Sequence, residues 1–247
     1  MKISKRLRVI SDLIPDNSFI LDIGCDHALL DIYTVLNKKN VTAIASDINE
    51  GPLEFAKMNV EKYNVSDKVF VVLGDGLSTY KDGVDTVIMS GLGSNTIVNI
   101  LNNGLDVLNN INTLIISSNN DYYFLRKNVC SLGFYIFDEK IVYDKGKYYP
   151  IIVFKKGTCR YSGFELKYGP ILLKSSDSVF FNYMIFNKKK LVKIYNSLQF
   201  KHFVKKVQIK KEIRFIDKTL LKNWVIFWYL VFFFVLIKKF VIIIYRW

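Results

Sequence analysis

The sequence of 247 residues is poor in the residue types that hold metals and covalent cross-links. It has three cysteines, Cys25, Cys130 and Cys159, and no C-x-x-C pair, which disfavours a disulfide framework and a structural zinc site. Because only two histidines occur, His27 and His202, we predict no metal site. The first residues also lack the apolar core of a signal peptide. These absences favour a metal-free protein of the reducing cytoplasm.

Acidic residues are scarce in the later part of the chain. Residues 1–154 contain 15 Lys and Arg against 18 Asp and Glu, whereas residues 155–222 contain 17 against 4. The net charge of +13 at pH 7 therefore arises after the first 154 residues. A mildly acidic body with a basic appendage indicates chemistry in the first part and polyanion binding in the second. A solvated lysine-rich helix without a partner would give the same composition.

Residues 19–28 have the pattern of a buried strand that leads through a small-residue turn into a helix. In α/β proteins such a turn places helix N–H groups beside a nucleotide-like ligand. The dinucleotide pattern G-x-G-x-x-G fails, because Asp26 occupies the position of its second glycine. Carboxylates at Asp22 and Asp26 would repel a diphosphate, but they suit the positive charges and hydroxyls of S-adenosylmethionine. Alone, the same residues would also fit an ordinary turn with a capping aspartate.

Acidic residues also follow the next two predicted strands. Asp47 ends the second strand, where a carboxylate can accept hydrogen bonds from the ribose hydroxyls of an adenosine ligand. Asp75 ends the third strand beside Gly76, where it can bond the exocyclic amine of adenine while glycine backbone approaches the ring. Acids at the carboxyl ends of successive strands therefore predict one acidic cradle, formed by Asp22, Asp47 and Asp75, for a cationic adenosyl donor.

The order of apolar segments predicts an α/β fold with a mostly parallel, doubly wound sheet. After the strand that begins at residue 19, strands are expected at 41–46, 69–73, 86–90, 113–117, 134–142 and 147–154, with helices between most of them. The last two strands are joined by residues 143–146 and should form an antiparallel hairpin. Gly91, Leu92 and Gly93 follow the fourth strand and offer a side-chain-poor floor for a flat base.

A change in composition predicts two domains and a tail. Residues 1–157 are the expected cofactor-binding domain, and residues 158–222 the expected basic helical hairpin, which breaks near residues 199–202. Such a hairpin suits a folded RNA better than a small substrate. The tail, residues 223–247, contains an apolar run over 224–237, which is short of the roughly 20 residues that span a bilayer. A membrane-surface anchor and an unselected extension of the reading frame are both open, and membrane contact is not favoured.

Several short motifs recur together in one known family. They are Ser4-Lys5-Arg6-Leu7, Asp22-Ile23-Gly24-Cys25-Asp26-His27-Ala28, Asn49-Glu50-Gly51-Pro52, Gly74-Asp75-Gly76-Leu77, Gly91-Leu92-Gly93, Asn119, Lys147-Tyr148-Tyr149 and Lys167-Tyr168-Gly169-Pro170. Over residues 1 to about 222 the chain thereby resembles the bacterial tRNA (adenine(22)-N1)-methyltransferases. The resemblance implies a Rossmann-like class I methyltransferase fold and S-adenosylmethionine as cofactor. It also implies tRNA as the partner, methylated at N1 of an adenine in its D-arm region. We infer no obligate protein partner from the sequence.

The motifs and the strand-end pattern together predict the site residues. Asp26 is expected beside the methyl group and the target base, Asn119 at the adenine edge, and His27 as a residue that orients the turn rather than a base. Predicted cofactor-binding residues are Asp22, Gly24, Cys25, Asp26, His27, Asp47, Ile48, Asp75, Gly76 and Ser90. Predicted tRNA-binding residues are Arg6, Arg8, Gly91, Leu92, Gly93, Arg126, Lys189 and Lys205.

Three positions depart from the family pattern. Ser94 ends a loop that is G-M-G-G in the family, Ser117-Ser118-Asn119 replaces Gln-Pro-Asn, and Asp47 replaces the usual Glu. Because the first two changes affect loops near the expected target base, a non-catalytic RNA-binding protein on a methyltransferase scaffold is the alternative hypothesis. The basic hairpin disfavours a small-molecule methyltransferase, and Asp26 disfavours a nicotinamide dehydrogenase.

Overall fold

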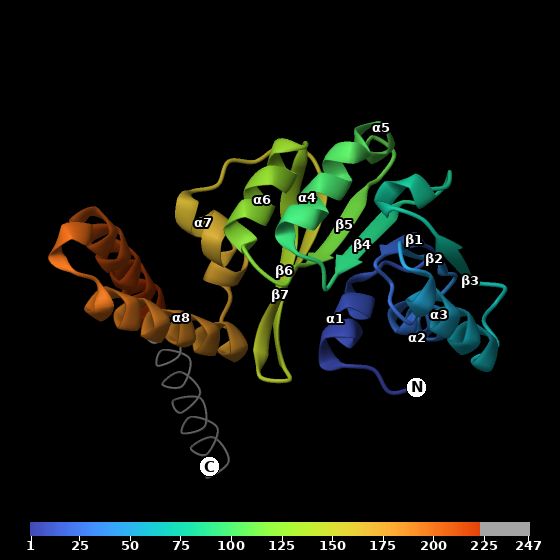
Figure 1. Cartoon of the computed structure of the whole chain (residues 1–247), viewed down its shortest axis with the longest axis horizontal. Coiled ribbons are helices and arrows are strands. Elements are labelled where there is room, and N and C mark those ends of the chain that lie inside the picture. Colours follow the sequence, from blue (N-terminus) through green and yellow to red (C-terminus); the bar gives the residue numbers. More distant parts are fainter. Residues whose placement is uncertain (223–247) are drawn as a thin grey trace, which may run out of the picture. The chain divides into compact units, whose positions relative to one another are not determined.

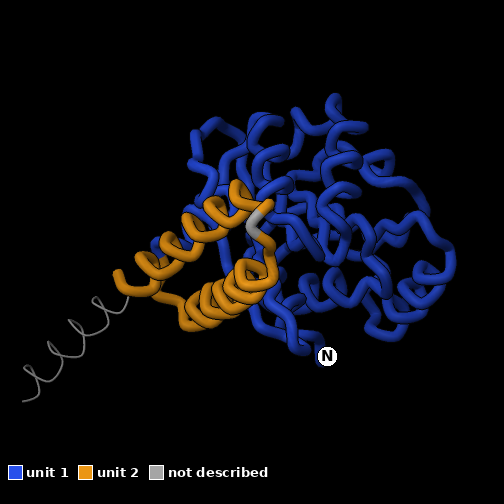
Figure 2. Tube along the Cα trace, turned by 60° about the vertical axis from the view of Figure 1, so that its left-hand side comes forward, with its two compact units in different colours: residues 1–174 blue, residues 175–247 orange. Residues whose placement is uncertain are grey.

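The computed structural model describes residues 1–222, apart from the side chain of Phe200, and the apolar tail expected at 223–247 lies outside the described residues. The chain divides into two compact units, here called unit 1 (residues 1–174) and unit 2 (residues 175 onward) (Figure 2). None of the helices within residues 1–222 has the length and apolar character needed to cross a membrane.

Unit 1 is built on a seven-stranded sheet with the strand order β3-β2-β1-β4-β5-β7-β6. The first five strands are parallel, and β7 runs antiparallel to both β5 and β6. The strands are β1 (Phe19–Ile23), β2 (Thr42–Asp47), β3 (Val69–Leu73), β4 (Thr86–Ser90), β5 (Thr113–Ser117), β6 (Phe134–Asp144) and β7 (Lys147–Lys156). The predicted mostly parallel sheet, closed by an antiparallel hairpin, is confirmed.

Helices cover both faces of this sheet (Figure 1). One apolar core joins the sheet to α1, α2 and α3, and a second core on the opposite face joins it to α4, α5 and α6. These helices are α1 (Lys5–Leu13), α2 (Leu29–Asn37), α3 (Glu50–Lys62), α4 (Ser94–Asn103), α5 (Leu105–Leu108) and α6 (Tyr122–Ser131). A short 3-10 turn, η1 (Gly76–Thr79), follows β3. Strands buried on both faces explain why their sequences are almost continuously apolar.

The register of the sheet brings the ends of neighbouring strands to the same level. Asp22 of β1 pairs with Ala45 of β2 and Ile88 of β4, while Asp47 pairs with Leu73 at the end of β3. Parallel strands thus deliver the residues that follow them to one edge of the sheet, which is where open α/β sheets bind ligands.

Helix α1 brings the N-terminal segment to the same edge. The hydroxyl of Ser4 accepts a hydrogen bond from the N–H of Leu7 (3.3 Å) and caps the helix, which ends shortly before Pro15. Ile10 is buried in the core over the sheet. This anchoring holds Arg6, one turn earlier, in a fixed position relative to β1.

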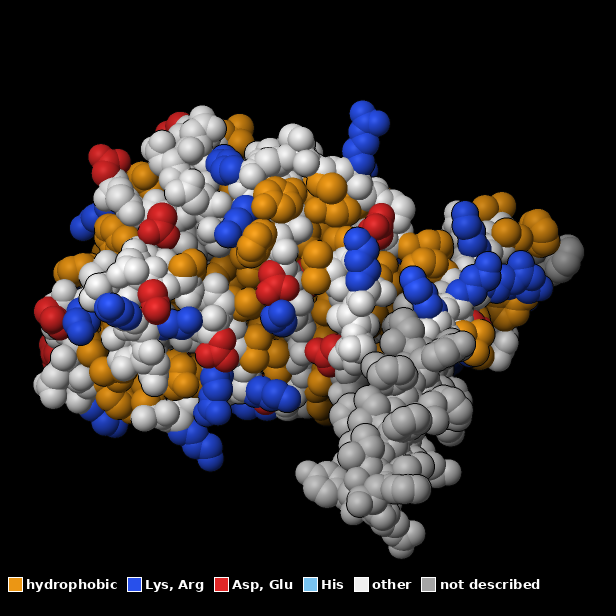
Figure 3. Space-filling view, turned by 180° about the vertical axis from the view of Figure 1, so that it is seen from behind, with side chains coloured by type: hydrophobic (Ala, Val, Ile, Leu, Met, Phe, Trp, Pro, Cys, Tyr) orange, Lys and Arg blue, Asp and Glu red, His pale blue; other side chains and the backbone are white. Residues whose placement is uncertain are grey.

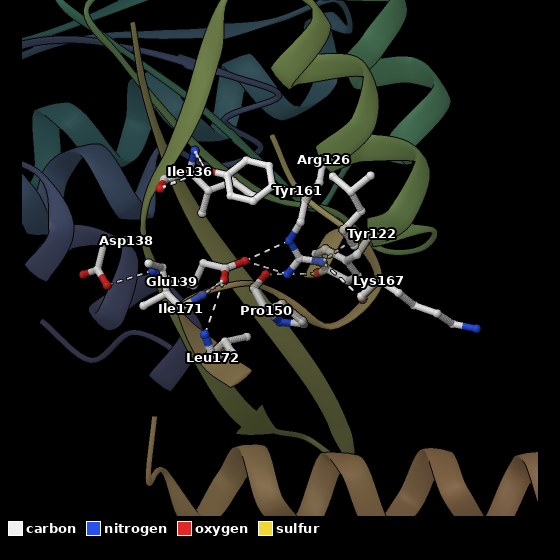
Figure 4. A network of polar contacts seen from close by, with 11 residues as sticks. Tyr122, Arg126, Ile136, Asp138, Glu139, Pro150, Tyr161, Lys167, Ile171 and Leu172 are labelled. Atoms are coloured by element: carbon white, nitrogen blue, oxygen red, sulfur yellow. Dashed lines mark hydrogen bonds and ion pairs between the residues drawn. The ribbon is translucent and has the colours of Figure 1, made fainter. Parts of the chain in front are cut away.

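Residues 158–174 belong to unit 1, so the predicted domain boundary at 157/158 is wrong. The segment contains α7 (Gly163–Tyr168) and η2 (Leu172–Lys174). Figure 4 shows how it is held: Arg126 of α6 donates to the carbonyl oxygens of Leu166 and Lys167, at 3.0 and 3.2 Å. Glu139 of β6 accepts from the N–H of Ile171 at 2.9 Å. These contacts between segments far apart in sequence move the boundary to 174/175.

Unit 2 consists of α8 (Ser178–Ser197), a 3-10 turn η3 (Phe200–His202) and a helix over 203–222. The break falls in the predicted region. Lys188 lies 2.5 Å from Asp217, and the ammonium group of Lys206 lies 5.3 Å from the ring centre of Tyr195. The contact made later in α8, at Tyr195, meets the earlier residue of the second helix, Lys206, so the two helices run antiparallel, as predicted. Figure 3 shows Lys and Arg side chains gathered on this unit.

Candidate cofactor and substrate site

A cavity of about 470 Å³ lies at the carboxyl edge of the sheet in unit 1. Its size is within the usual range of small-molecule sites. The sequence-predicted residues around it are Arg6, Gly24, Asp26, Asp47, Ile48, Asp75, Gly76, Ser90, Gly91 and Leu92. A smaller cavity of about 90 Å³ shares four of these residues and adds Asp22, Cys25 and His27. The predicted acids therefore lie around two cavities that share lining residues. Asp47 and Asp75 line the larger cavity, whereas Asp22 lines the smaller one.

The turn between β1 and α2 depends on backbone conformations that side chains disfavour. Gly24 has φ +76°, and its N–H donates to the carbonyl of Ser46 at 2.8 Å. A Cβ at Gly24 would lie 3.2 Å from the side chain of Leu92, so the glycine also allows the close approach of the loop after β4. Asp26 adopts φ +54°, and its side chain is 74% exposed and lines both cavities. The turn thus presents a carboxylate toward the space where a ligand would lie.

His27 lines the smaller cavity and is held by contacts with neighbouring residues of the turn and of α3. Its Nε2 lies 3.6 Å from Oδ1 of Asp26, and its ring meets that of Phe55 edge-on at 5.2 Å. The carbonyl oxygen of His27 accepts a hydrogen bond from the side chain of Asn59 at 3.0 Å. These contacts support the predicted role of His27 in orienting the turn.

The acids after β2 and β3 lie in the larger cavity together with one exposed apolar residue. The carboxylate of Asp47 accepts from the backbone and side-chain N–H groups of Asn49, at 2.9 and 3.2 Å, which fixes its orientation. Ile48 is 63% exposed although it is a large apolar side chain. Asp75 lies on the same wall, next to Gly76. An apolar platform between two carboxylates matches an adenosine, which has a flat base, an exocyclic amine and ribose hydroxyls.

One orphaned polar atom supports the fit of S-adenosylmethionine to this place. The hydroxyl of Ser90 is buried and has no hydrogen-bond partner among the described residues, and it lines both cavities. Buried hydroxyls normally find partners, so an unpaired one beside a cavity indicates a ligand contact. The surrounding carboxylates provide acceptors for the cationic groups of the cofactor.

A pair of buried carboxyl groups lies below the smaller cavity. Asp22 is 4% exposed, Asp31 on α2 is 0% exposed, and their side chains are within hydrogen-bonding reach of one another. Burial raises the pKa of Asp22 to about 7, while the hydrogen bond with Asp31 lowers it and the charge of Asp47 raises it. Burial and the negative charge of Asp22 raise the pKa of Asp31 well above its ordinary value. Burial is also the main cause that raises the pKa of Cys25, which keeps that residue a neutral thiol.

Hydrogen bonds of the segment 118–120 tie the loop after β5 to the loop after β4, in the region where the sequence departs from the family pattern. The side-chain amide of Asn119 donates to the carbonyl of Gly91, and its backbone N–H donates to the carbonyl of Leu92 at 2.9 Å. The hydroxyl of Ser118 donates to the same Leu92 carbonyl at 3.3 Å. Asn120 caps α4 by accepting from the N–H of Ser94 at 2.9 Å. Asn119, Asn120 and Ser118 therefore hold the two loops together, and contact between Asn119 and the adenine edge stays a prediction.

One predicted tRNA-binding residue is wrong. Arg126 is 1% exposed, and its guanidinium lies 2.8 Å from the carboxylate of Glu139. A fully buried, paired arginine cannot contact a tRNA phosphate, and its position is explained by the network that holds residues 158–174. Arg8 is exposed on α1 and does not line either cavity. Lys189 and Lys205 are exposed on unit 2.

Two residues near the site were missed by sequence reasoning. Tyr149 of β7 packs against Arg6, whose guanidinium carbon lies 4.9 Å from the ring centre. A Cβ at Gly91 would lie 3.8 Å from the same guanidinium, so Arg6 reaches the floor of the cavity. Tyr149 belongs to the motif Lys147-Tyr148-Tyr149, which contributes to the family resemblance, but the sequence gave no indication of its role. Asp31 is the second missed residue, and its only signal was a single acid inside the apolar run 28–32.

Comparisons with known proteins agree with this geometry. A family model described as a methyltransferase domain matches residues 3–152. A tRNA (adenine(22)-N(1))-methyltransferase from Bacillus subtilis (strain 168) is 36% identical over 187 residues, which cover 73% of this chain and 79% of that protein. The structure of M. capricolum TrmK in complex with S-adenosylhomocysteine is 32% identical, with a TM-score of 0.77, and covers 89% of this chain and 98% of its own. A Streptococcus pneumoniae protein, described as a candidate tRNA (m1A22) methyltransferase and solved with S-adenosyl-L-methionine, is 31% identical with a TM-score of 0.81, covering 89% and 100%.

Proposed function

The chain belongs to the tRNA (adenine(22)-N1)-methyltransferase family, and on that basis we propose that it transfers the methyl group of S-adenosylmethionine to N1 of adenine 22 in tRNA. The observation that carries the proposal is the cavity at the carboxyl edge of the sheet, where Asp26, Asp47 and Asp75 meet around Gly24. A cytoplasmic location, where tRNA is modified, is part of the same proposal.

Each residue around the cavity has a role that follows from its position. Asp47 accepts hydrogen bonds from the ribose hydroxyls, and Asp75 accepts one from the adenine amine of the cofactor. Ile48 packs against the adenine ring, and Ser90 uses its unpaired hydroxyl in a ligand contact. Gly24 leaves room for the cofactor beside the N-terminal turn of α2. These roles account for every acid that the sequence places at a strand end, apart from Asp22.

The chemistry needs positioning more than it needs a base. When bound, S-adenosylmethionine supplies an electrophilic methyl group, and N1 of adenine already carries a free lone pair. The task of the protein is therefore to align the two and to stabilise the positive charge that the adenine gains. Asp26 is exposed within the cavity and carries the carboxylate that can do so. Arg6, held against Tyr149, and the loop that begins at Gly91 bound the space available to the target base.

Unit 2 supplies the positive charge that a tRNA backbone requires. Residues 175–222 contain 12 Lys and Arg against 3 Asp and Glu, and most of the lysines of the helical hairpin are exposed. Phosphate contacts of this kind give affinity without reading sequence. We assign Lys189 and Lys205 to such contacts, so unit 2 binds the folded tRNA while unit 1 performs methyl transfer.

One experiment tests the proposal directly. Full-length protein is incubated with radiolabelled S-adenosylmethionine and either a tRNA transcript with adenine at position 22 or the same transcript with guanine there. The product is digested and its nucleosides are separated. Labelled N1-methyladenosine from the first transcript alone supports the proposal. Label on both transcripts, or on a different atom, would assign another target, and binding of tRNA without any transfer would favour the non-catalytic alternative.

A further inference from the structure

The buried carboxyl group of Asp31 has no role in the mechanism above. It belongs to α2, and its carboxyl oxygens receive no hydrogen bond from another residue of the described chain. Its neighbour within hydrogen-bonding reach is the carboxyl of Asp22. Two carboxylates cannot accept from one another, so their contact requires that one of them carries a proton.

We propose that Asp31 is a positioning residue that stays protonated and donates its hydrogen bond to Asp22, which thereby presents a single, oriented negative charge to the bound S-adenosylmethionine. The inference rests on the proposed function, since it deepens the account of the same site. Asp31 does not touch the cavity itself, whereas Asp22 lines the smaller cavity beside Gly24 and Ser90. Asp31 therefore acts through Asp22.

The charged groups that face Asp22 come from each element packed around it. Arg6 of α1 and Asp47 at the end of β2 act on it through space, with opposite effects. Cys25, Asp26 and His27 of the turn line the same small cavity. Together with Asp31 of α2, these groups leave Arg6 as the single permanent cation beside the carboxyl pair among the described residues. A cationic ligand would add the missing positive charge.

The balance of charge explains why one proton is shared. Ionising both acids would place two negative charges in contact away from water, which is strongly unfavourable. Ionising neither would leave no charge for the cofactor. Asp22 lines the smaller cavity, where its charge can be solvated or paired, whereas Asp31 is 0% exposed and lines neither cavity. The contact between the two lowers the pKa of Asp22 and raises the pKa of Asp31. Asp22 is therefore the member that ionises, and Asp31 is the member that keeps the proton.

Calorimetric titration of S-adenosylmethionine into the full chain between pH 5.5 and 8 tests this assignment. Affinity of the wild type should rise with pH, by up to tenfold per unit, and level off above the pKa of Asp22. Asp31→Asn keeps a neutral donor and should follow the wild-type curve within about twofold. Asp31→Val removes the donor, so the pKa of Asp22 should rise and the curve should move to higher pH. At pH 7 its affinity should be about tenfold weaker for each unit of that displacement.

The controls separate this inference from the proposed function. Titration of the ligand itself is common to all variants and cancels in the comparison. Asp67→Asn, which neutralises an exposed aspartate in the loop before β3, should leave the curve unchanged. The shared proton is refuted if the affinity–pH curve of Asp31→Asn shifts as that of Asp31→Val does, or if neither variant shifts the curve. In both cases the cofactor site itself is not contradicted. Absence of any binding to the wild type would instead refute the proposed function.

Discussion

Unit 1 contains two buried carboxyl clusters that differ in how they are satisfied. Glu139 faces the guanidinium of Arg126 at 2.8 Å and also accepts from the backbone of Ile171, so its charge is balanced and hydrogen-bonded (Figure 4). Asp22 and Asp31 face one another without a cation in direct contact among the described residues. The first cluster lies where residues 158–174 pack on the sheet, and the second lies beside the cofactor cavity. The buried carboxylate that is paired with a cation thus has a structural role, whereas the buried carboxyl pair without a cation in contact in the described part of the chain lies beside a binding site.

The largest effect on stability should come from disrupting the buried pair of Arg126 and Glu139. Glu139→Gln keeps the shape of the side chain but leaves Arg126 buried without its counter-charge, which should lower the free energy of unfolding by about 3–5 kcal/mol. Urea unfolding measures the decrease. Asp138→Asn is the matched control, because Asp138 forms a partly exposed pair with Lys140 at 3.1 Å, and such pairs contribute about 0–1 kcal/mol. If the free energy of unfolding decreased equally in the two variants, the buried pair of Arg126 and Glu139 would contribute no more to stability than the partly exposed pair.

The next largest effect concerns the exposed acid of the cavity. Asp26→Ala should reduce methyl transfer by about 10²–10³-fold, the range expected when a preorganised electrostatic interaction is removed. Its side chain is largely exposed, so the fold should stay intact, and only the strain of alanine at φ +54° should lower the midpoint of urea unfolding. Single-turnover transfer to tRNA measures the effect, with Asp67→Ala as the exposed control. Full activity of Asp26→Ala would show that Asp26 has no part in methyl transfer, and that an acid lining the cavity need not be functional.

A smaller effect is expected in the pH dependence of the free energy of unfolding, because the carboxyl pair of Asp22 and Asp31 has no cation in direct contact within residues 1–222. Because the pKa of Asp22 is raised in the folded state to about 7, the native protein binds a proton that the unfolded chain releases near pH 4. The stability that this proton provides is complete below pH 4 and is lost as the pH rises to about 7. Relative to Asp22→Asn, the wild type should therefore lose up to about 1.4 kcal/mol per pH unit across that window.

Urea unfolding of both proteins at pH 4.5, 5.5 and 6.5 measures this difference. Asp67→Asn serves again as the exposed control and should show no comparable slope. A constant difference between wild type and Asp22→Asn at the three pH values would mean that Asp22 is ionised throughout, as an acid paired with a cation would be.

The smallest effect should come from charges that are exposed rather than buried. Replacing Lys189 and Lys205 by alanine should weaken tRNA binding, because each lysine neutralises a phosphate of the RNA backbone. The slope of log affinity against log salt should become shallower by about 0.7–0.9 for each phosphate that is no longer neutralised. Affinity for S-adenosylmethionine should stay unchanged. Filter binding at several salt concentrations measures the slope, and Lys57→Ala on α3 is the control in unit 1. An unchanged slope would remove these two lysines from the RNA surface.

Much of the fold and the acidic edge could be predicted because both follow local patterns. Strands buried on two faces appear as apolar runs, and an acid that ends such a run must lie at the edge of the sheet. Asp47 and Asp75 lie at that edge and line the larger cavity for that reason. The hydrogen bond from Ser118 to the carbonyl of Leu92, in a loop where the sequence departs from the family pattern, could not be predicted in the same way.

The errors arose where long-range contacts decide the role of a residue. Arg126 is a basic residue of helix α6 in a protein expected to bind RNA, and nothing nearby in sequence indicates that Glu139, on strand β6, pairs with its charge. Residues 158–174 were assigned to the second domain because their attachment depends on that same pair. Asp31 was missed because a helix pattern shows one polar residue and cannot show that it meets Asp22.

A crystal structure of the full chain with S-adenosylhomocysteine would test the central claim most directly. We expect the ribose hydroxyls to lie within hydrogen-bonding distance of Asp47 and the adenine to contact Ile48 and Asp75. The amino-acid end of the ligand should extend toward Gly24 and Ser90, above Asp22. Ligand density elsewhere on the molecule, with these acids facing solvent alone, would contradict the claim.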